Sequence, residues 1–494
     1  MKKRETVTEA KISNLDELTK VLSVKKHAQE QLLVVMQTFG IGKIIRNLKF
    51  EKVQGFTLSS LFITLVIMRL WGKTVASTTS NNIQKLCNVS KNTLYRALLN
   101  ERINWRMFLT QITLRFHAIL QERQVNTDTN EICAILDDTT FQKTGIRIEG
   151  VSKVFDHVTH RFIYGMKCLT LAISDGISCY PIDFSIHREK GKNKDYGLTS
   201  RQLKEQFQKQ RNAKNPDYAR KAECDESKLE MSKRMLCHAV KHGITFKYVL
   251  ADSWFTCESL IHAVRKLCDS AVHYIGLVKM NPQIRYQTRK SNRPQNIHEL
   301  IASYERTASC YCRKYKCKYI QLNVKIGEEP VRIFIIKYGR SINWKVLLTT
   351  DTSMNFVKAF ELYERRWGIE VIFKECRGYL GLGKCQSRSY NAQIADTTLC
   401  FMMYQMLSLA KRFSEYETMG ILFRSERDQL QMLTLWSRTL AEVKHLLEML
   451  SRESSVDLLE CLSTVATQQT ADFSTKVWAH LLCDSDDLAM PDLC

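Results

Sequence analysis

Two short apolar segments of the sequence each end in an aspartate. Residues 132–136 are followed by Asp137 and Asp138, and residues 246–251 are followed by Asp252. Each segment has the length and composition of a buried strand, where a carboxylate is costly unless it is solvated, paired or bound to a metal. One such aspartate is also typical of a helix N-cap or a turn. Two in one basic chain favour a metal site that includes Asp138 and Asp252.

A third carboxylate, Glu370, lies in a segment that is predicted to be helical. Drawn at ~100° per residue, the segment places Tyr363, Arg366, Glu370, Lys374 and Arg377 in one stripe about 80° wide, beside a separate apolar flank. Such a helix would surround one carboxylate with cations and a tyrosine hydroxyl. The alternative is an ordinary surface helix with intrahelical salt bridges.

These residue types suit phosphodiester chemistry. The hard divalent cations Mg²⁺ and Mn²⁺ take oxygen ligands, and a pair of them activates an attacking water or 3′ hydroxyl and stabilises the leaving oxygen. Asp138, Asp252 and Glu370 are therefore the predicted catalytic and metal-binding residues. The neighbouring cations are predicted to hold phosphates on either side of the scissile bond.

The elements around these residues divide the chain into four regions. Residues 1–125 have helical periodicity, strands and helices share residues 126–284 and 351–410, residues 285–350 are β-rich, and residues 411–494 are again helical. We therefore expect an α/β unit with a β-rich insertion between Asp252 and Glu370, flanked by a helical N-terminal domain and a helical C-terminal region. The Asp-Gly pair at residues 175–176 lies between apolar runs and predicts a hairpin.

Composition indicates a nucleic-acid partner. The 494 residues carry a formal net charge of +22, and clustered lysine and arginine side chains displace counterions from phosphates. Residues 82–100 have the pattern of a DNA-reading helix-turn-helix, with Ser90 as N-cap of its second helix. An ordinary surface helix is the alternative there.

Other classes of protein are not favoured. The 17 cysteines and a basic, polar N-terminus predict reduced thiols in the cytosol. The longest apolar run, residues 55–71, contains Arg69 and is short for a membrane span, so we expect a buried helix and no membrane association. Cys310, Cys312 and Cys317 lie close together but lack a fourth zinc ligand at the usual spacing.

Three ordered motifs resemble those of bacterial DDE transposases of the insertion-sequence-four type. The string Tyr363-x2-Arg366-x3-Glu370-x6-Arg377 resembles the Tyr-Arg-Glu-Lys signature of that group, and LDDTT at 136–140 and VLADSWF at 249–255 resemble its two aspartate motifs. The segments at 154–167, 181–191 and 380–389 are also similar to that group. The resemblance covers residues 130 to 410.

The resemblance implies an RNase H-like catalytic core and two Mg²⁺ or Mn²⁺ ions per active site. It implies Asp138, which directly precedes a threonine, as the metal ligand, and leaves Asp137 as a supporting partner. Tyr363 and Arg366 would contact the terminal phosphates. One departure is Arg377, which stands where the group has lysine, and Lys374 would share its role. Trp344 is a candidate for base stacking, with a core position as the alternative.

The predicted function is cut-and-paste DNA transposition in the bacterial cytoplasm, in association with the nucleoid. The partners would be double-stranded DNA, both terminal inverted repeats and target, and a second copy of the chain in a synaptic homodimer. Two alternatives stay open. One is an RNase H-like metal-dependent nuclease without strand transfer, and the other is a non-catalytic DNA-binding regulator.

Overall fold

The computed structural model describes residues 38–50, 58–70, 72, 75, 90–125, 131–156, 159–190, 196–289, 293–339, 341 and 343–428. The chain divides into two compact units, Glu101–Gln405 on the one hand and Met1–Asn100 with Met406–Cys494 on the other. Each unit is described by itself. The helix α14 (Tyr390–Arg412) contains the point of division.

The unit Glu101–Gln405 is built on one mixed sheet. Its strands are β1 (Cys133–Gln142), β2 (Ser152–Asp156), β3 (Arg161–Ser174), β4 (Cys179–His187), β5 (Tyr248–Ala251), β6 (His273–Val278), β7 (Gln287–Thr288), β8 (Ser309–Cys312), β9 (Cys317–Ile326), β10 (Glu329–Tyr338) and β11 (Trp344–Thr349). The main path through the sheet runs β2-β3-β1-β5-β6-β11-β10-β9-β7, with β4 paired to β3 and β8 paired to β9.

The sheet contains both parallel and antiparallel strand pairs. The strand β5 runs parallel to both β1 and β6, whereas β3 is antiparallel to β1 and to β4. From β11 to β9 every pair is antiparallel. The predicted hairpin joins β3 to β4, where Asp175 Oδ1 accepts the amides of Ile177 and Ser178 and Gly176 has φ +88°. A positive φ at this turn suits glycine.

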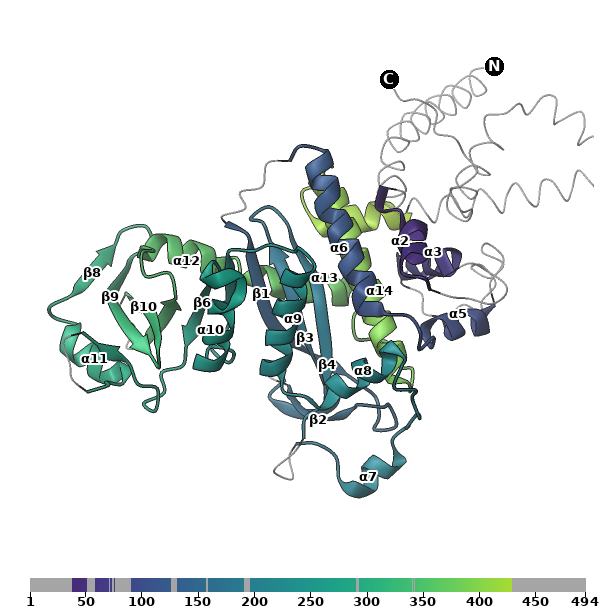
Figure 1. The fold of residues 1–494 in the computed structure, drawn as a ribbon, viewed down its shortest axis with the longest axis horizontal. Coiled ribbons are helices and arrows are strands. Elements are labelled where there is room, and N and C mark those ends of the chain that lie inside the picture. Colours follow the sequence, from purple (N-terminus) through teal and green to yellow (C-terminus); the bar gives the residue numbers. More distant parts are fainter. Residues whose placement is uncertain are drawn as a thin grey trace, which may run out of the picture. The chain divides into compact units, whose positions relative to one another are not determined.

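The helices of this unit cover the sheet. They are α6 (Trp105–Glu122), α7 (Ser200–Glu205), α8 (Pro216–Ala222), α9 (Lys228–Lys241), α10 (Glu258–Arg265), α11 (Ile297–Tyr304), α12 (Phe356–Glu364), α13 (Trp367–Tyr379) and most of α14, with 3₁₀ turns at Glu223–Asp225 and Leu267–Ser270. Figure 1 shows α9 across β3 and β4, which it contacts, while α13 contacts β1 and β4. The helix α11 lies inside the segment that the sequence predicted to be β-rich.

The first half of the central strand β1 is buried on both faces. Cys133, Ala134, Ile135 and Leu136 all have 0% of their surface exposed, because β3 and β5 flank the strand and helices cover it. The first four residues of β1 are therefore apolar without alternation, whereas the polar residues Asp137 to Thr140 follow in the second half of the strand.

In the other unit the described elements are helical. They are α2 (Ile41–Asn47), α3 (Leu58–Leu70), α5 (Lys91–Leu98), the end of α14 and a helical stretch at residues 419–428. The helix α3 packs against α2 and α5. The predicted N-cap is present, since Ser90 Oγ accepts the amide of Thr93 at 3.3 Å. Residues 82–89, the first part of the predicted helix-turn-helix, lie outside the described residues.

Candidate active site

The two aspartate motifs lie on neighbouring strands of the sheet. The prediction that the first strand ends at its aspartates is wrong, because β1 stays paired with β3 as far as Gln142, and Asp137 and Asp138 lie in the middle of the strand. In the parallel pair of β1 and β5, Leu136 stands opposite Ala251, so the next positions along the two strands are Asp137 and Asp252. A turn fixes the Asp252 side chain, because its Oδ1 accepts the amides of Trp254 at 2.9 Å and Phe255 at 3.3 Å. The two motifs therefore lie side by side where β5 ends, halfway along β1.

Glu370 approaches the same edge from the junction of two helices. The segment that the sequence analysis treated as one helix is divided into α12 and α13, which meet at residues 365 and 366. Tight backbone bonds close this junction, from the Arg366 amide to Tyr363 O at 3.0 Å and from the Ile369 amide to Arg366 O at 3.2 Å. Glu370 thus lies in the first turn of a new helix.

Arg366 connects this helix to β1. Its Nη2 donates to Glu370 Oε1 at 2.6 Å, and its Nη1 donates to Asp137 Oδ2 at 3.2 Å. The contact with Glu370 is an i,i+4 salt bridge, the kind of pair that the alternative interpretation of this segment predicted. Because Arg366 binds both Asp137 and Glu370, Asp137 rather than Asp138 lies on the side of β1 that faces Glu370.

Asp138 points elsewhere. Its Oδ2 accepts a hydrogen bond from Nζ of Lys228, the first residue of α9. Neighbouring Lys167 donates to Thr140 Oγ1 at 2.8 Å, on the same side of β1 as Asp138. The structure therefore brings Asp137, Asp252 and Glu370 toward one another and directs Asp138, the residue favoured by the motif, toward α9.

The charge around Asp137 is only partly compensated. Burial is the main cause that raises the pKa of Asp137 to about 7, and the carboxylates of Asp252 and Asp138 add to this while Arg366 opposes it. A carboxylate held among like charges in a buried place is a favourable site for a cation. The donors are all hard oxygens, which fits Mg²⁺ or Mn²⁺.

Tyr363 completes the surroundings of this edge. Its hydroxyl is buried without a hydrogen-bond partner in the described part of the chain. Burial raises the pKa of Tyr363 to about 12, with Asp252 and Asp137 adding to the effect and Arg366 opposing it. Over the described ranges no three acidic, histidine or cysteine side chains are already gathered closely enough to hold a metal, and Arg366 lies between Asp137 and Glu370.

The predicted DNA-contacting residues have different surroundings. Lys374 is exposed, whereas Arg377 donates from Nη2 to Thr139 Oγ1 and to Thr140 O at 3.0 Å. Arg377 therefore ties α13 to β1. Of the signature cations after Glu370, Lys374 is the one that faces solvent.

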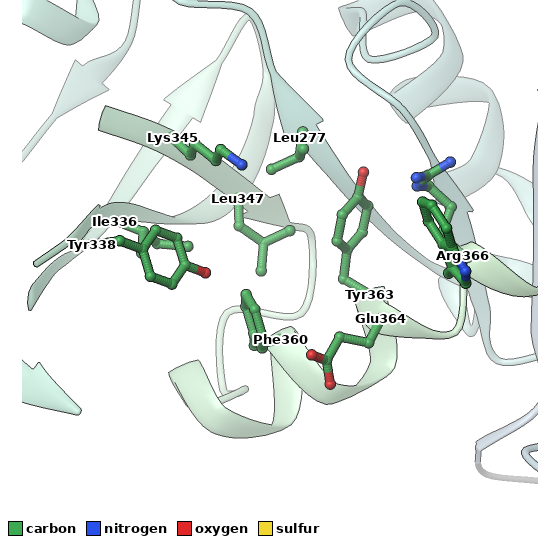
Figure 2. Close-up of a pocket in the computed structure, with 10 residues that line it drawn as sticks. Leu277, Ile336, Tyr338, Lys345, Leu347, Phe360, Tyr363, Glu364 and Arg366 are labelled. Atoms are coloured by element: carbon green, nitrogen blue, oxygen red, sulfur yellow. The ribbon is translucent and has the colours of Figure 1, made fainter. Parts of the chain in front are cut away.

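A groove of about 480 Å³ opens beside Tyr363 and Arg366. Figure 2 shows these two side chains on one side of it and Tyr338 on the other, with Phe360 on α12 between them. Sequence spacing does not reveal this aromatic lining, because its residues come from three separate elements, β10, α12 and α13. Trp344 is not among the lining residues and lies under Lys337, whose Nζ is 5.0 Å from the ring centroid.

The basic segment 188–221 contains two short helices, α7 and α8. Its arginines are engaged with acidic partners: Arg211 bonds Glu149 at 2.5 Å and Asp217 at 2.7 Å, and Arg188 bonds Asp225 at 2.5 Å. In this segment the described ion pairs hold the fold together.

Cys312 and Cys317 are register partners on β8 and β9 as free thiols. Among the helices that the structure describes, none combines the length and apolar character needed to cross a bilayer.

Comparison with known families agrees with this geometry. Residues 68–296 match the family model described as DDE superfamily endonuclease, and residues 225–406 match the one described as Transposase DDE domain. No curated protein matches the chain. The mixed sheet and its helices, together with the endonuclease match, fit an RNase H-like core.

Proposed function

With the DDE endonuclease and transposase domains as the premise, we propose that this protein cleaves the ends of a mobile DNA element and joins the 3′ ends to target DNA. The observation that carries the proposal is the meeting of three segments at one sheet edge. These are the aspartate pair that includes Asp138, the turn at Asp252, and the start of α13 with Glu370.

The residues that would hold the divalent cations are Glu370, Asp252 and the aspartate pair of β1, in which the motif favours Asp138. When bound, two Mg²⁺ or Mn²⁺ ions supply an activated oxygen nucleophile and stabilise the leaving oxygen. The protein contributes fixed geometry. The turn at Trp254 and Phe255 holds the Asp252 carboxylate, and Arg366 holds that of Glu370.

DNA contacts are proposed for Tyr363, Arg366, Lys374 and Arg377. Support comes from the exposed position of Lys374 and from the groove that opens beside Tyr363 and Arg366. The net charge of +22 favours a polyanionic partner. We further propose a homodimer that brings two inverted repeats together, acting at the bacterial nucleoid.

The test is cleavage of a labelled duplex that carries the terminal repeat, which the DNA flanking the gene supplies. Glu370→Gln and Asp252→Asn are expected to abolish Mg²⁺-dependent cleavage and to keep DNA binding in a gel-shift assay. Glu361→Gln on α12 is the matched control, because this glutamate pairs with Lys314 away from the sheet edge. Full cleavage by Glu370→Gln would refute the proposal.

The endonuclease family match favours a second candidate, a nuclease that does not join strands. Supplying pre-cut ends with free 3′ hydroxyls and a target plasmid separates the two. Joined product supports the transposase, and its absence in a reaction where cleavage proceeds supports the nuclease. Sequence-specific binding without any metal-dependent product would instead indicate a DNA-binding regulator.

A further inference from the structure

The face of β1 that carries Asp137 continues past the candidate active site. Every second side chain of the strand from Asp137 onward shares this face, and Asp138 lies on the other. Phe141 packs here against the backbone of Gly383, where an added Cβ would lie 2.9 Å from the ring. Lys143 is the next residue on this face, directly after the end of β1. The chain that follows α13 therefore runs along this face, away from Asp137.

Two buried side chains hold this loop by alternate carbonyls. Lys143 Nζ donates to Gly383 O at 2.9 Å and to Cys385 O at 2.7 Å. Gln393 Nε2 donates to Ser387 O at 2.8 Å. Only 4% of Lys143 and 2% of Gln393 are exposed. The loop is thus extended, and an ammonium and an amide fix it from beneath at every second residue.

The side chains between these carbonyls face solvent. Lys384, Gln386 and Arg388 are exposed and alternate with half-buried residues, so all three lie on one side of the extended loop 383–388. Neither Lys384 nor Arg388 forms an ion pair within the part of the chain that the structure describes. In the basic segment 188–221, by contrast, arginines bind carboxylates. The loop therefore presents two uncompensated positive charges in fixed positions.

The distance from these charges to the candidate active site suits duplex DNA. The strand positions from Asp137 to Lys143 span about 20 Å at roughly 3.3 Å per residue. A duplex rises about 3.4 Å per base pair, so the same distance corresponds to about six base pairs. A duplex with one phosphate near Asp137 would have further phosphates beside the loop.

We propose that Lys384 and Arg388 bind backbone phosphates of duplex DNA about six base pairs from the bond that is cut, and that Lys143 preorganises the loop that carries them. Phosphate contacts fix the position of a duplex and do not read its sequence. The loop therefore sets how the DNA lies relative to the candidate active site. This inference rests on the proposed function for the identity of the duplex, and it adds a contact surface to the residues named there.

The first experiment measures how salt weakens the binding of the full chain to a duplex that carries the terminal repeat. Binding is followed by fluorescence anisotropy without divalent metal, at roughly 50–200 mM salt. Lys384→Ala/Arg388→Ala is expected to reduce the slope of log K against log salt concentration by about 2, because each lost phosphate contact removes about 1. An unchanged slope refutes the proposal.

The matched control removes two exposed lysines at the opposite end of the parallel strands. Lys241 ends α9 and Lys266 caps α10, so they precede β5 and β6, whereas Asp252 follows the end of β5. Lys241→Ala/Lys266→Ala makes the same change in net charge and is expected to keep the wild-type slope. An equal fall in both double variants would assign the effect to net charge and overturn the role of the loop.

The preorganising role is tested with Lys143→Met. This variant is expected to weaken binding about 2- to 10-fold with the wild-type slope, because both cations remain and only the order of the loop is lost. An unchanged affinity or a reduced slope would refute this role. Gly383→Ala, which adds a Cβ against Phe141, distorts the same loop without removing a buried charge. It is expected to give the same result and keeps the test available if Lys143→Met does not fold.

Neutral methylphosphonate linkages, placed singly along the duplex, locate the contacts. Wild-type protein is expected to lose affinity at a linkage about six base pairs from the cleavage site, and Lys384→Ala/Arg388→Ala is expected to be insensitive to it. Equal sensitivity of the two proteins would contradict the assignment. If Glu370→Gln still cleaves, the proposed function fails, whereas these binding measurements without metal still decide the role of the loop.

Discussion

His187 on β4 provides a sharp test of the packing beneath the Asp138 face. Its side chain is buried, with only 3% of the residue exposed. Nδ1 lies 3.1 Å from Glu226 O and Nε2 lies 2.6 Å from Ser185 Oγ. This network assigns a neutral imidazole that donates from Nδ1 and accepts at Nε2. Protonation would place a charge in a site built for the neutral ring.

Burial lowers the pKa of His187 from 6.5 to about 4, and Lys228 lowers it further while Glu226 O, Glu223 and Asp138 oppose the shift. The unfolded chain therefore binds a proton that the folded chain does not, so stability rises with pH across this window. At about 1.4 kcal/mol per pH unit the full difference is about 3 kcal/mol. The stability lost through protonation of His187 is negligible above pH 6.5, reaches about 2 kcal/mol at pH 5, and has its full value below pH 4.

The assay is hydrogen exchange of peptides from β3 and β4 at pH 7.5 and pH 5, corrected for the intrinsic pH dependence of exchange. Between pH 7.5 and pH 5, the free energy of opening in wild-type protein is expected to fall by about 2 kcal/mol because of His187 protonation. In His187→Gln this contribution is absent, so the fall is expected to be about 2 kcal/mol smaller than in wild type. His298→Gln, an exposed position on α11, is the control and should behave as wild type. An equal loss in His187→Gln and wild type would refute the reasoning.

Three further predictions concern stability. Arg106→Met is expected to cost about 3–5 kcal/mol in thermal unfolding, because Arg106 binds two carboxylates whose side chains are only 4% and 5% exposed. Arg115→Met, which breaks an exposed pair on the same helix, should cost at most ~1 kcal/mol, and equal losses would contradict the argument. Gly276→Ala is expected to lower the free energy of unfolding by about 1–3 kcal/mol and to slow cleavage, because a Cβ there would lie 2.7 Å from the threonine hydroxyl that donates to Asp252 O. The control is Gly378→Ala in α13, where a Cβ meets nothing within 4 Å, and this change should raise the free energy of unfolding by roughly 0.5–1 kcal/mol. Lys143→Met is expected to lower the free energy of unfolding by about 1–3 kcal/mol and to speed proteolysis of residues 383–388, because the Lys143 ammonium binds two carbonyls of that loop. An unchanged rate of proteolysis in this loop would contradict the prediction.

Local patterns in the sequence determined much of this site. Apolar runs followed by a carboxylate predicted the strands β1 and β5, although β1 continues past its aspartates to Gln142. The Asp-Gly pair at 175–176 predicted the turn between β3 and β4. Helical spacing placed Arg366 near Glu370, and the salt bridge between them is the one that the alternative interpretation of this segment predicted. Each of these features depends on residues that are near in sequence, so strand, turn and helix periodicities are sufficient to find them.

The directions of Asp137 and Asp138 were decided only by the tertiary structure. Alternation along β1 could not predict them, because residues 133–136 are buried on both faces of a central strand and carry no polar side. The partners that distinguish the two aspartates, Lys228 on α9 and Arg366 beside α13, are 90 and 229 residues away along the chain. The sequence thus determined that carboxylates meet at this edge. The packing of a helix on each face of the sheet decided which of them faces Glu370.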